Sequence, residues 1–298
     1  MPERNRFQLA ADRMLAGALF GLTGAIGRLP IDRSLSLAHG IGVRIGPLTP
    51  RHRIVLDNLS RALPELSAQR RAEIGREMWG HQARLIVESA FPEALLEFGT
   101  PGDEKRIEID DRIGVENIKD GGPYLVVTAH MGCFEFLPAF AKGAGIKVTS
   151  LFRRPNNPFI AARLIEQRER IGGRLIRAHK GAARALFGEL RAGRNVGLLV
   201  DQKFRAGPQI DFFGRPAPTN PLITRLARMV DDRIIGARCI RLPRNRYRIT
   251  IDWFPRLPRD PDGRVDERPA LLLVNRTVES WVRDHPEQWM WFHRRWQT

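Results

Sequence analysis

The sequence predicts an α/β fold in which helices flank a mixed central sheet. Two apolar runs bounded by turn residues, 124–129 and 196–200, are typical of strands buried on both faces. Helical patterns alternate with such runs after residue 99, which is the order of a layered α/β core. Because the earlier segment looks helical, we expect one domain over 31–298, made of a helical platform (31–98) and a core (99–298) that carries the chemistry.

The spacing of apolar residues and the turn residues between them place the individual elements. Pro64 should stop the first platform helix, and Ser67 should cap the start of the second. Strands are expected at 106–109, 124–129, 147–152, 196–200, 233–240 and 247–253, and helices at 51–63, 67–89, from about 134, and at 158–170, 179–191, 219–229 and 271–283.

The N-terminal segment carries an uncharged apolar run, 14–27, between Arg13 and Arg28. Fourteen residues are fewer than the roughly 20 needed to cross a hydrocarbon core of about 30 Å. We therefore expect residues 1–30 to form an uncleaved anchor helix that lies in the inner leaflet. An ordinary buried helix is the alternative, and a signal peptide is weakly supported because no clear cleavage site follows.

Charge and cysteine content restrict the partners. The chain holds 49 Lys and Arg against 33 Asp and Glu, a net charge of +16, which points to an anionic partner. No nucleic-acid-binding motif is present, so a membrane surface is favoured over nucleic acid. Cys133 and Cys239 lie far apart and show no metal-ligand spacing or disulfide framework, which is compatible with a reducing compartment.

The segment 128–135 (TAHMGCFE) places His130 at the carboxyl end of a predicted buried strand, the edge where open α/β sheets bind ligands. A bend at Gly132 would let Glu135 reach the imidazole and hold it. A ring held in this way can take a proton from a hydroxyl. On spacing alone, a structural histidine that caps the next helix is the alternative, and a Cys133 nucleophile is disfavoured because buried cysteines usually serve packing.

Further segments occur with the His-x4-Glu box in a recognisable order. These segments are 58–64, 152–158 (FRRPNNP), 201–202 (DQ), 212–219 (FFGRPAPT) and 286–296 (PEQWMWFHRRW). With these motifs the chain resembles the late acyltransferases of lipid A (lipopolysaccharide) biosynthesis, the lauroyl and myristoyl transferases of the lysophospholipid acyltransferase-like superfamily. The similarity covers roughly residues 50–298.

The resemblance implies a specific reaction. An acyl thioester, usually on acyl carrier protein and alternatively on coenzyme A, would donate its chain to a hydroxyl of a lipid A precursor at the cytoplasmic face of the inner membrane. His130 would be the general base and Glu135 would orient it. Arg153 or Arg154 would bind acceptor phosphate or steady the oxyanion, and Asp201 would organise the second strand edge or the arginine. No metal or organic cofactor is implied.

Several other interpretations stay open. An enzyme of the same superfamily could acylate another lipid, such as a phosphatidylinositol mannoside, an ornithine lipid or a lysophospholipid. A non-catalytic basic protein could bind the membrane surface through the same fold. The segment 293–295 (HRR) could be a second phosphate site or a packed terminus. The remaining histidines show no partner pattern and are expected to be surface or packing residues: His39, His52, His81, His179 and His285.

Overall fold

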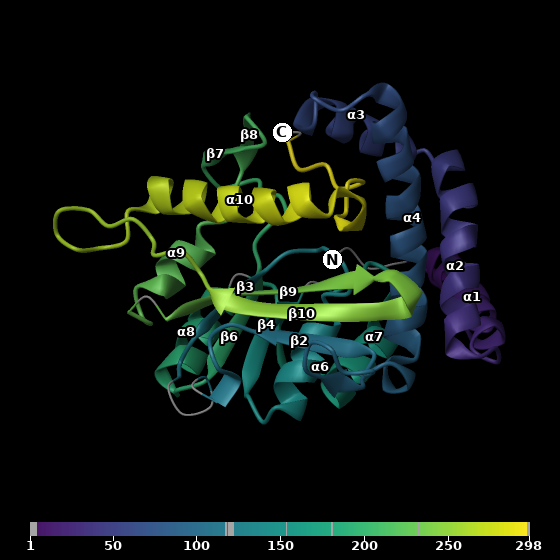
Figure 1. Ribbon diagram of the computed structural model, residues 1–298, viewed down its shortest axis with the longest axis horizontal. Coiled ribbons are helices and arrows are strands. Elements are labelled where there is room, and N and C mark those ends of the chain that lie inside the picture. The colour runs from purple at the N-terminus through teal and green to yellow at the C-terminus, as the bar shows by residue number, and fades with distance from the viewer. Residues whose placement is uncertain are drawn as a thin grey trace.

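The computed structural model describes residues 5–116, 118, 122–152, 154–179, 181–231 and 233–296. Here an eight-stranded mixed sheet carries helices on both faces, which confirms the predicted α/β fold (Figure 1). All neighbouring strands are parallel except β9 and β10. In sheet order the strands are β1 (Phe98–Gly99), β2 (Ile107–Asp111), β10 (Arg246–Trp253), β9 (Ile234–Leu242), β3 (Leu125–Thr128), β6 (Asn195–Leu199), β4 (Val148–Phe152) and β5 (Arg174–Arg177).

Burial at the centre of the sheet follows from the apolar runs seen in the sequence. The predicted strands 124–129 and 196–200 are β3 and β6, which lie side by side and in parallel. Both faces of β3 are covered, and Leu125 and Val127 are fully buried. Strand β5 was not expected, because it is a short edge strand whose arginine ends are exposed. The hairpin of β7 (Gln209–Phe212) and β8 (Arg215–Pro218) was also missed, since each strand has only four residues.

Helices cover the two faces of the sheet, as Figure 1 shows. On one side lie α6 (Phe136–Gly143) and α7 (Pro158–Ile171), and on the other α8 (Ala182–Arg191), α9 (Leu222–Ala227) and α10 (Glu267–Asp284). Helix α7 begins where the sequence predicts: the side chain of Asn157 accepts hydrogen bonds from the backbone N–H groups of Phe159 and Ile160. Short 3₁₀ turns occur at Gly46–Leu48 (η1), Pro92–Ala94 (η2), Pro243–Asn245 (η3) and Pro286–Gln288 (η4).

The helical platform consists of α2 (Ile31–Ile45), α3 (His52–Ala62) and α4 (Ala68–Ala90). Ser67 caps α4, accepting a hydrogen bond from the Arg70 amide at 3.1 Å, as expected. Helices α2 and α4 pack closely because both carry glycine at their contact. A Cβ on Gly42 would collide with the Trp79 carbonyl oxygen, and one on Gly80 would come within 2.6 Å of the His39 ring.

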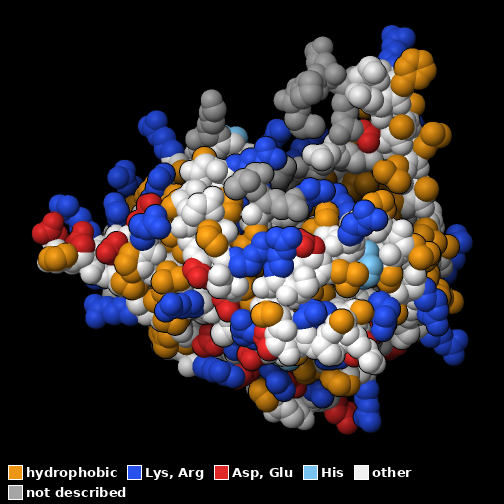
Figure 2. All heavy atoms as spheres, turned by 90° about the horizontal axis from the view of Figure 1, so that it is seen from above, with side chains coloured by type: hydrophobic (Ala, Val, Ile, Leu, Met, Phe, Trp, Pro, Cys, Tyr) orange, Lys and Arg blue, Asp and Glu red, His pale blue; other side chains and the backbone are white. Residues whose placement is uncertain are grey.

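Helix α1 (Arg6–Ile26) has 21 residues and is longer than the predicted apolar run, because a capping box between Asn5 and Gln8 starts it earlier. Among the described helices it alone is long and apolar enough to cross a membrane by length and composition. Its apolar side chains are largely exposed, with Phe7 at 87% and Met14 at 72%. Figure 2 shows hydrophobic side chains along the edge where α1 and α2 lie in Figure 1. This surface suits association with a membrane.

Candidate active site

Strand register brings His130 and Asp201 together. Strands β3 and β6 are parallel with Thr128 opposite Leu199, and the Val200 amide donates a hydrogen bond to the Thr128 carbonyl at 3.1 Å. His130 and Asp201 each follow the last residue of their strand by two positions, so both side chains emerge at the same carboxyl edge of the sheet.

Three N–H groups donate to the Asp201 carboxylate. They are the His130 backbone amide at 2.9 Å, the His130 ring Nδ1 at 2.8 Å and the Trp289 indole Nε1 at 2.8 Å. Burial by itself raises the pKa of Asp201, but the His130 charge and these hydrogen bonds outweigh it and lower the pKa to about 2. An ionised Asp201 accepts from Nδ1–H, which leaves Nε2 as the basic nitrogen of the ring.

The loop after β3 is fixed by the C-terminal segment. Gly132 has φ +52°, and a Cβ there would collide with the carbonyl oxygen of Cys239. Its amide donates to the Gln288 carbonyl at 2.9 Å, and Met131 forms a β-bridge with Trp289. The motif at 286–289 therefore holds the His130 loop and supplies the indole that completes the Asp201 site.

The prediction that Glu135 holds the His130 ring is wrong in this structure. Glu135 is the residue that precedes α6, and its carboxylate pairs with the Arg168 guanidinium, whose Nε donates to Glu135 Oε2 at 2.9 Å. The physical reason is competition: Asp201 already occupies the Nδ1 side of the ring, and a guanidinium gives the Glu135 carboxylate a forked partner. Asp201, expected to organise a strand edge, is instead the partner of His130.

Of the two predicted substrate arginines, the structure describes only Arg154, which lines neither cavity near His130. Arg153 lies outside the described residues, and Arg154 is exposed in the segment between β4 and α7. Arg168, from α7, was missed by the sequence reasoning and lines both cavities near His130. Its guanidinium also lies over the Phe152 ring, 4.8 Å from the centroid. No motif marks Arg168, because it lies within an ordinary amphipathic helix.

A cavity of about 400 Å³ contains the His130 side chain. The Gln202 amide nitrogen lies 3.1 Å from His130 Nε2, so it donates to the basic nitrogen. Lys203 and the exposed Phe204 also line the cavity, which places its mouth at the surface. Partial desolvation and the nearby Arg205 and Arg294 guanidiniums lower the pKa of Lys203. The mouth therefore has a strong positive potential that favours anions.

A second cavity, of about 120 Å³, lies beneath the sheet and is walled mainly by apolar side chains. It runs between α6 and the strands β3, β4, β6, β9 and β10. The two cavities share the residues Phe134, Leu151, Phe152, Arg168 and Leu199. Glu135 and Arg168 therefore stand where a polar chamber beside His130 meets an apolar one.

The other candidate residues are packed into the protein. Cys133 is fully buried, and this burial raises the pKa of its thiol well above the usual value, which disfavours the nucleophilic thiolate. Arg295 is fully buried and donates to the Pro218 carbonyl at 2.8 Å and to Thr219 Oγ1 at 2.9 Å. Burial lowers the pKa of His293 to about 4. Within the segment 293–295, His293 is thus half-buried, Arg294 is exposed and Arg295 is packed in the interior.

Comparison with known proteins agrees with this architecture. The model of the family described as bacterial lipid A biosynthesis acyltransferase matches residues 4–298. The chain belongs to this family. It is similar to the lipid A biosynthesis myristoyltransferase of Escherichia coli (strain K12), with 26% identity over 256 residues covering 83% of this chain and 75% of that protein. Lipid A biosynthesis acyltransferase 2 of Shigella flexneri is 26% identical over 298 residues, covering 98% and 92%.

A relative named for a different acyl group, the lipid A biosynthesis palmitoleoyltransferase of Escherichia coli (strain K12), is 24% identical over 273 residues, covering 87% of this chain and 84% of that protein. The predicted family and the predicted acyltransferase activity are therefore confirmed. Because these relatives are named for different acyl groups, membership of the family does not specify which acyl chain is transferred.

Proposed function

We propose that this acyltransferase moves a fatty acyl chain from an acyl carrier protein thioester to a hydroxyl of a lipid A precursor, with His130 as general base. The observation that carries the proposal is the His130–Asp201 pair, which leaves Nε2 basic inside a cavity that adjoins an apolar one. Family membership supplies the reaction class.

The proposed chemistry uses one proton carrier. Nε2 of His130 takes the hydroxyl proton, displacing the Gln202 amide, and the alkoxide oxygen attacks the thioester carbonyl carbon. Collapse of the tetrahedral intermediate breaks the carbon–sulfur bond, and the leaving thiolate receives the proton from the imidazolium. Asp201 stabilises that imidazolium and keeps the ring in the correct tautomer, so it is a positioning residue. Donors near the carbonyl, the Gln202 amide and the Arg168 guanidinium, would stabilise the oxyanion.

Charge supports anionic substrates on both sides of the reaction. Lys203 lines the His130 cavity and Arg205 and Arg294 lie near Lys203, so the phosphate of a lipid A precursor or an acidic carrier would dock there. The exposed apolar face of α1 would hold the enzyme at the cytoplasmic face of the inner membrane, where such an acceptor stays while a soluble carrier delivers the donor.

The direct test is incubation of the purified enzyme with acyl carrier protein thioesters and a lipid A precursor, followed by mass measurement of the lipid. The precursor mass is expected to increase by one acyl group, and coenzyme A thioesters should react at least about tenfold more slowly because they lack the acidic protein surface. Phosphatidylinositol mannoside, an ornithine lipid precursor and a lysophospholipid serve as parallel acceptors. Transfer to one of these and not to the lipid A precursor would contradict the proposal.

The apolar cavity is proposed to hold the transferred chain, and filling it should shorten the preferred donor. Ala141 on α6 lines this cavity, and Ala141→Phe would remove space for about two methylene groups. Each buried methylene contributes about 0.8 kcal/mol, so kcat/KM for the preferred chain should fall roughly 15-fold relative to a donor two carbons shorter. Competition between donors of mixed length, with products separated by mass, measures this ratio.

Ala185→Phe is the matched control, because Ala185 is exposed on α8 and the same side-chain volume is added outside the cavity. This control should keep the wild-type preference. An Ala141→Phe enzyme that folds normally and still prefers the same chain length would show that the acyl group binds elsewhere.

A further inference from the structure

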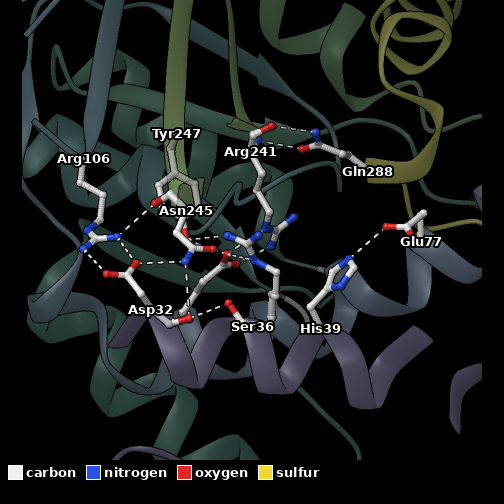
Figure 3. Close-up of polar contacts among 11 residues, drawn as sticks. Asp32, Ser36, His39, Glu77, Arg106, Arg241, Asn245, Tyr247 and Gln288 are labelled. Atoms are coloured by element: carbon white, nitrogen blue, oxygen red, sulfur yellow. Dashed lines mark hydrogen bonds and ion pairs between the residues drawn. The ribbon is translucent and has the colours of Figure 1, made fainter. Parts of the chain in front are cut away.

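Two histidines and a glutamate converge where helices α2 and α4 pack. His39 comes from α2, and Glu77 and His81 come from α4, one turn apart on the same face. His39 Nε2 lies 3.0 Å from Glu77 Oε2, and one ligand atom from each of the three residues lies within 4.8 Å of the other two. Figure 3 shows His39 and Glu77 facing each other, joined by this contact. None of the three lines either cavity beside His130.

His81 provides a second, independent observation. It is 9% exposed, and its Nδ1 is buried without a hydrogen-bond partner among the described residues. A buried polar atom left unpaired costs about 1–3 kcal/mol, so a ring placed in this way calls for a ligand. The ring stands edge-on to His39, with centroids 5.6 Å apart.

The donor set fits a transition metal ion. Two imidazole nitrogens and one carboxylate oxygen are ligands of zinc, which binds each at about 2.0–2.2 Å in a tetrahedron. Those bond lengths put neighbouring ligand atoms roughly 3.4 Å apart, a spacing that small side-chain rotations would reach from the arrangement seen here. The side chains of His39 and Glu77 are 29% and 45% exposed, so water can supply the fourth ligand.

Two arginines near His81 oppose an added positive charge, and neighbouring carboxylates offset part of it. Gly80 gives the His39 ring its space, since a Cβ there would lie 2.6 Å from the ring. Arg84 and Arg241 lie near His81, but both pair with the buried Glu88 carboxylate, which offsets part of their charge. Glu77 adds a second carboxylate directly at the site.

We propose that His39, Glu77 and His81 bind a divalent transition metal ion, zinc or one of similar size, that ties α2 to α4. The ion takes no part in acyl transfer and acts as a clip within the helical platform. It also gives the buried His81 ring a ligand and orders the contact between α2 and α4.

The test uses tag-free full-length enzyme, stripped with a chelator and titrated with zinc by calorimetry. One zinc per chain should bind, and Tm should rise on binding. Glu77→Gln, a change at a half-exposed position that should leave the fold intact, is expected to weaken zinc binding at least about tenfold and to remove the rise in Tm. His39→Asn and His81→Asn should do the same.

His179→Gln is the matched control, because His179 is exposed and lies outside the helical platform, where its ring Nδ1 accepts a hydrogen bond from the Gly181 amide at 2.9 Å. This variant should bind zinc like the wild type. Cobalt adds a spectroscopic readout, since a four-coordinate site gives strong visible absorption that Glu77→Gln should abolish. Zinc binding that is absent, or that Glu77→Gln leaves unchanged, would overturn the proposal whether or not the enzyme transfers acyl groups.

Discussion

Replacing Asp201 by asparagine is expected to lower kcat for acyl transfer by about 10³- to 10⁴-fold, the scale seen when the acid of a hydrolase triad is neutralised. Three N–H donors face the two oxygens of Asp201. Asparagine offers one acceptor oxygen and an NH₂ group, so at least one donor must face another donor. The His130 ring can relieve the clash by carrying its proton on Nε2, where it can no longer accept the substrate proton. Steady-state kinetics should show the loss in kcat with little change in KM.

The benchmark for this prediction is His130→Ala, which should lower kcat by about as much as Asp201→Asn. Combining the two changes should lower kcat no further than either single change, because the two residues act as a unit. Asp57→Asn is the matched control, since Asp57 pairs with Arg61 on the exposed surface and should keep wild-type activity. Nearly full activity in a folded Asp201→Asn enzyme would remove Asp201 from the proposed mechanism.

Glu135→Gln distinguishes this arrangement from a His130–Glu135 pair. Glu135 contacts the Arg168 guanidinium, so its neutralisation should act on substrate binding through Arg168 and lower kcat/KM by about 10-fold. Arg168→Gln should cost a similar factor, and the double variant should cost much less than the product of the two. If Glu135→Gln instead matched His130→Ala while Asp201→Asn stayed active, Glu135 would be the partner of the imidazole during turnover.

The sequence singled out His130, the proposed base, but paired it with a carboxylate that does not contact it, for a reason that lies in the topology. Strand-end position singled out both His130 and Asp201, because apolar runs bounded by turns mark buried parallel strands. Which strands are neighbours depends on the packing of the whole sheet, so a separation of 71 positions along the chain hid the contact between the two side chains. The nearest acid in sequence, Glu135, was chosen instead. No sequence pattern marks Arg168 as a site residue, since arginine is common on the polar face of an amphipathic helix.

The same limit applies to the C-terminal segment. Its motif was recognisable, but its role depends on contacts made more than 80 residues away. Trp289 donates to Asp201, and the Gln288 carbonyl accepts from Gly132. The Gln288 side chain also exchanges two hydrogen bonds with the backbone of Arg241, at 2.8 and 3.0 Å (Figure 3). These contacts connect the His130 loop to a buried charged cluster of Glu88 on α4, Arg241 on β9 and Tyr247 on β10, which sequence patterns did not indicate.

Glu88 is the centre of that cluster, and Glu88→Ala is expected to lower the free energy of unfolding by about 3–5 kcal/mol. The Glu88 carboxylate is completely buried. It pairs with Arg241, whose Nε donates to Oε1 at 2.8 Å, and it accepts the Tyr247 hydroxyl at 2.8 Å. Removing the carboxylate leaves the buried Arg241 guanidinium without its ion-pair partner, so the full desolvation cost of that charge destabilises the folded state. Denaturant unfolding followed by far-ultraviolet circular dichroism measures the loss.

Glu73→Ala is the matched control on the same helix, because Glu73 pairs with Arg70 at the exposed surface and its replacement should lower the free energy of unfolding by at most about 1 kcal/mol.

The pH dependence of stability gives a second check on Glu88. Burial by itself raises the pKa of Glu88, but the charge and hydrogen bonds of Arg241 outweigh it and hold the pKa below its ordinary value of 4.5. A lowered folded-state pKa means that the stabilisation is complete above pH 4.5 and is lost as the pH falls through the folded-state value. The stability gap between wild type and Glu88→Gln should therefore be constant near neutral pH and narrow in acid, and a gap that widens on acidification would show that Glu88 is not held as a carboxylate.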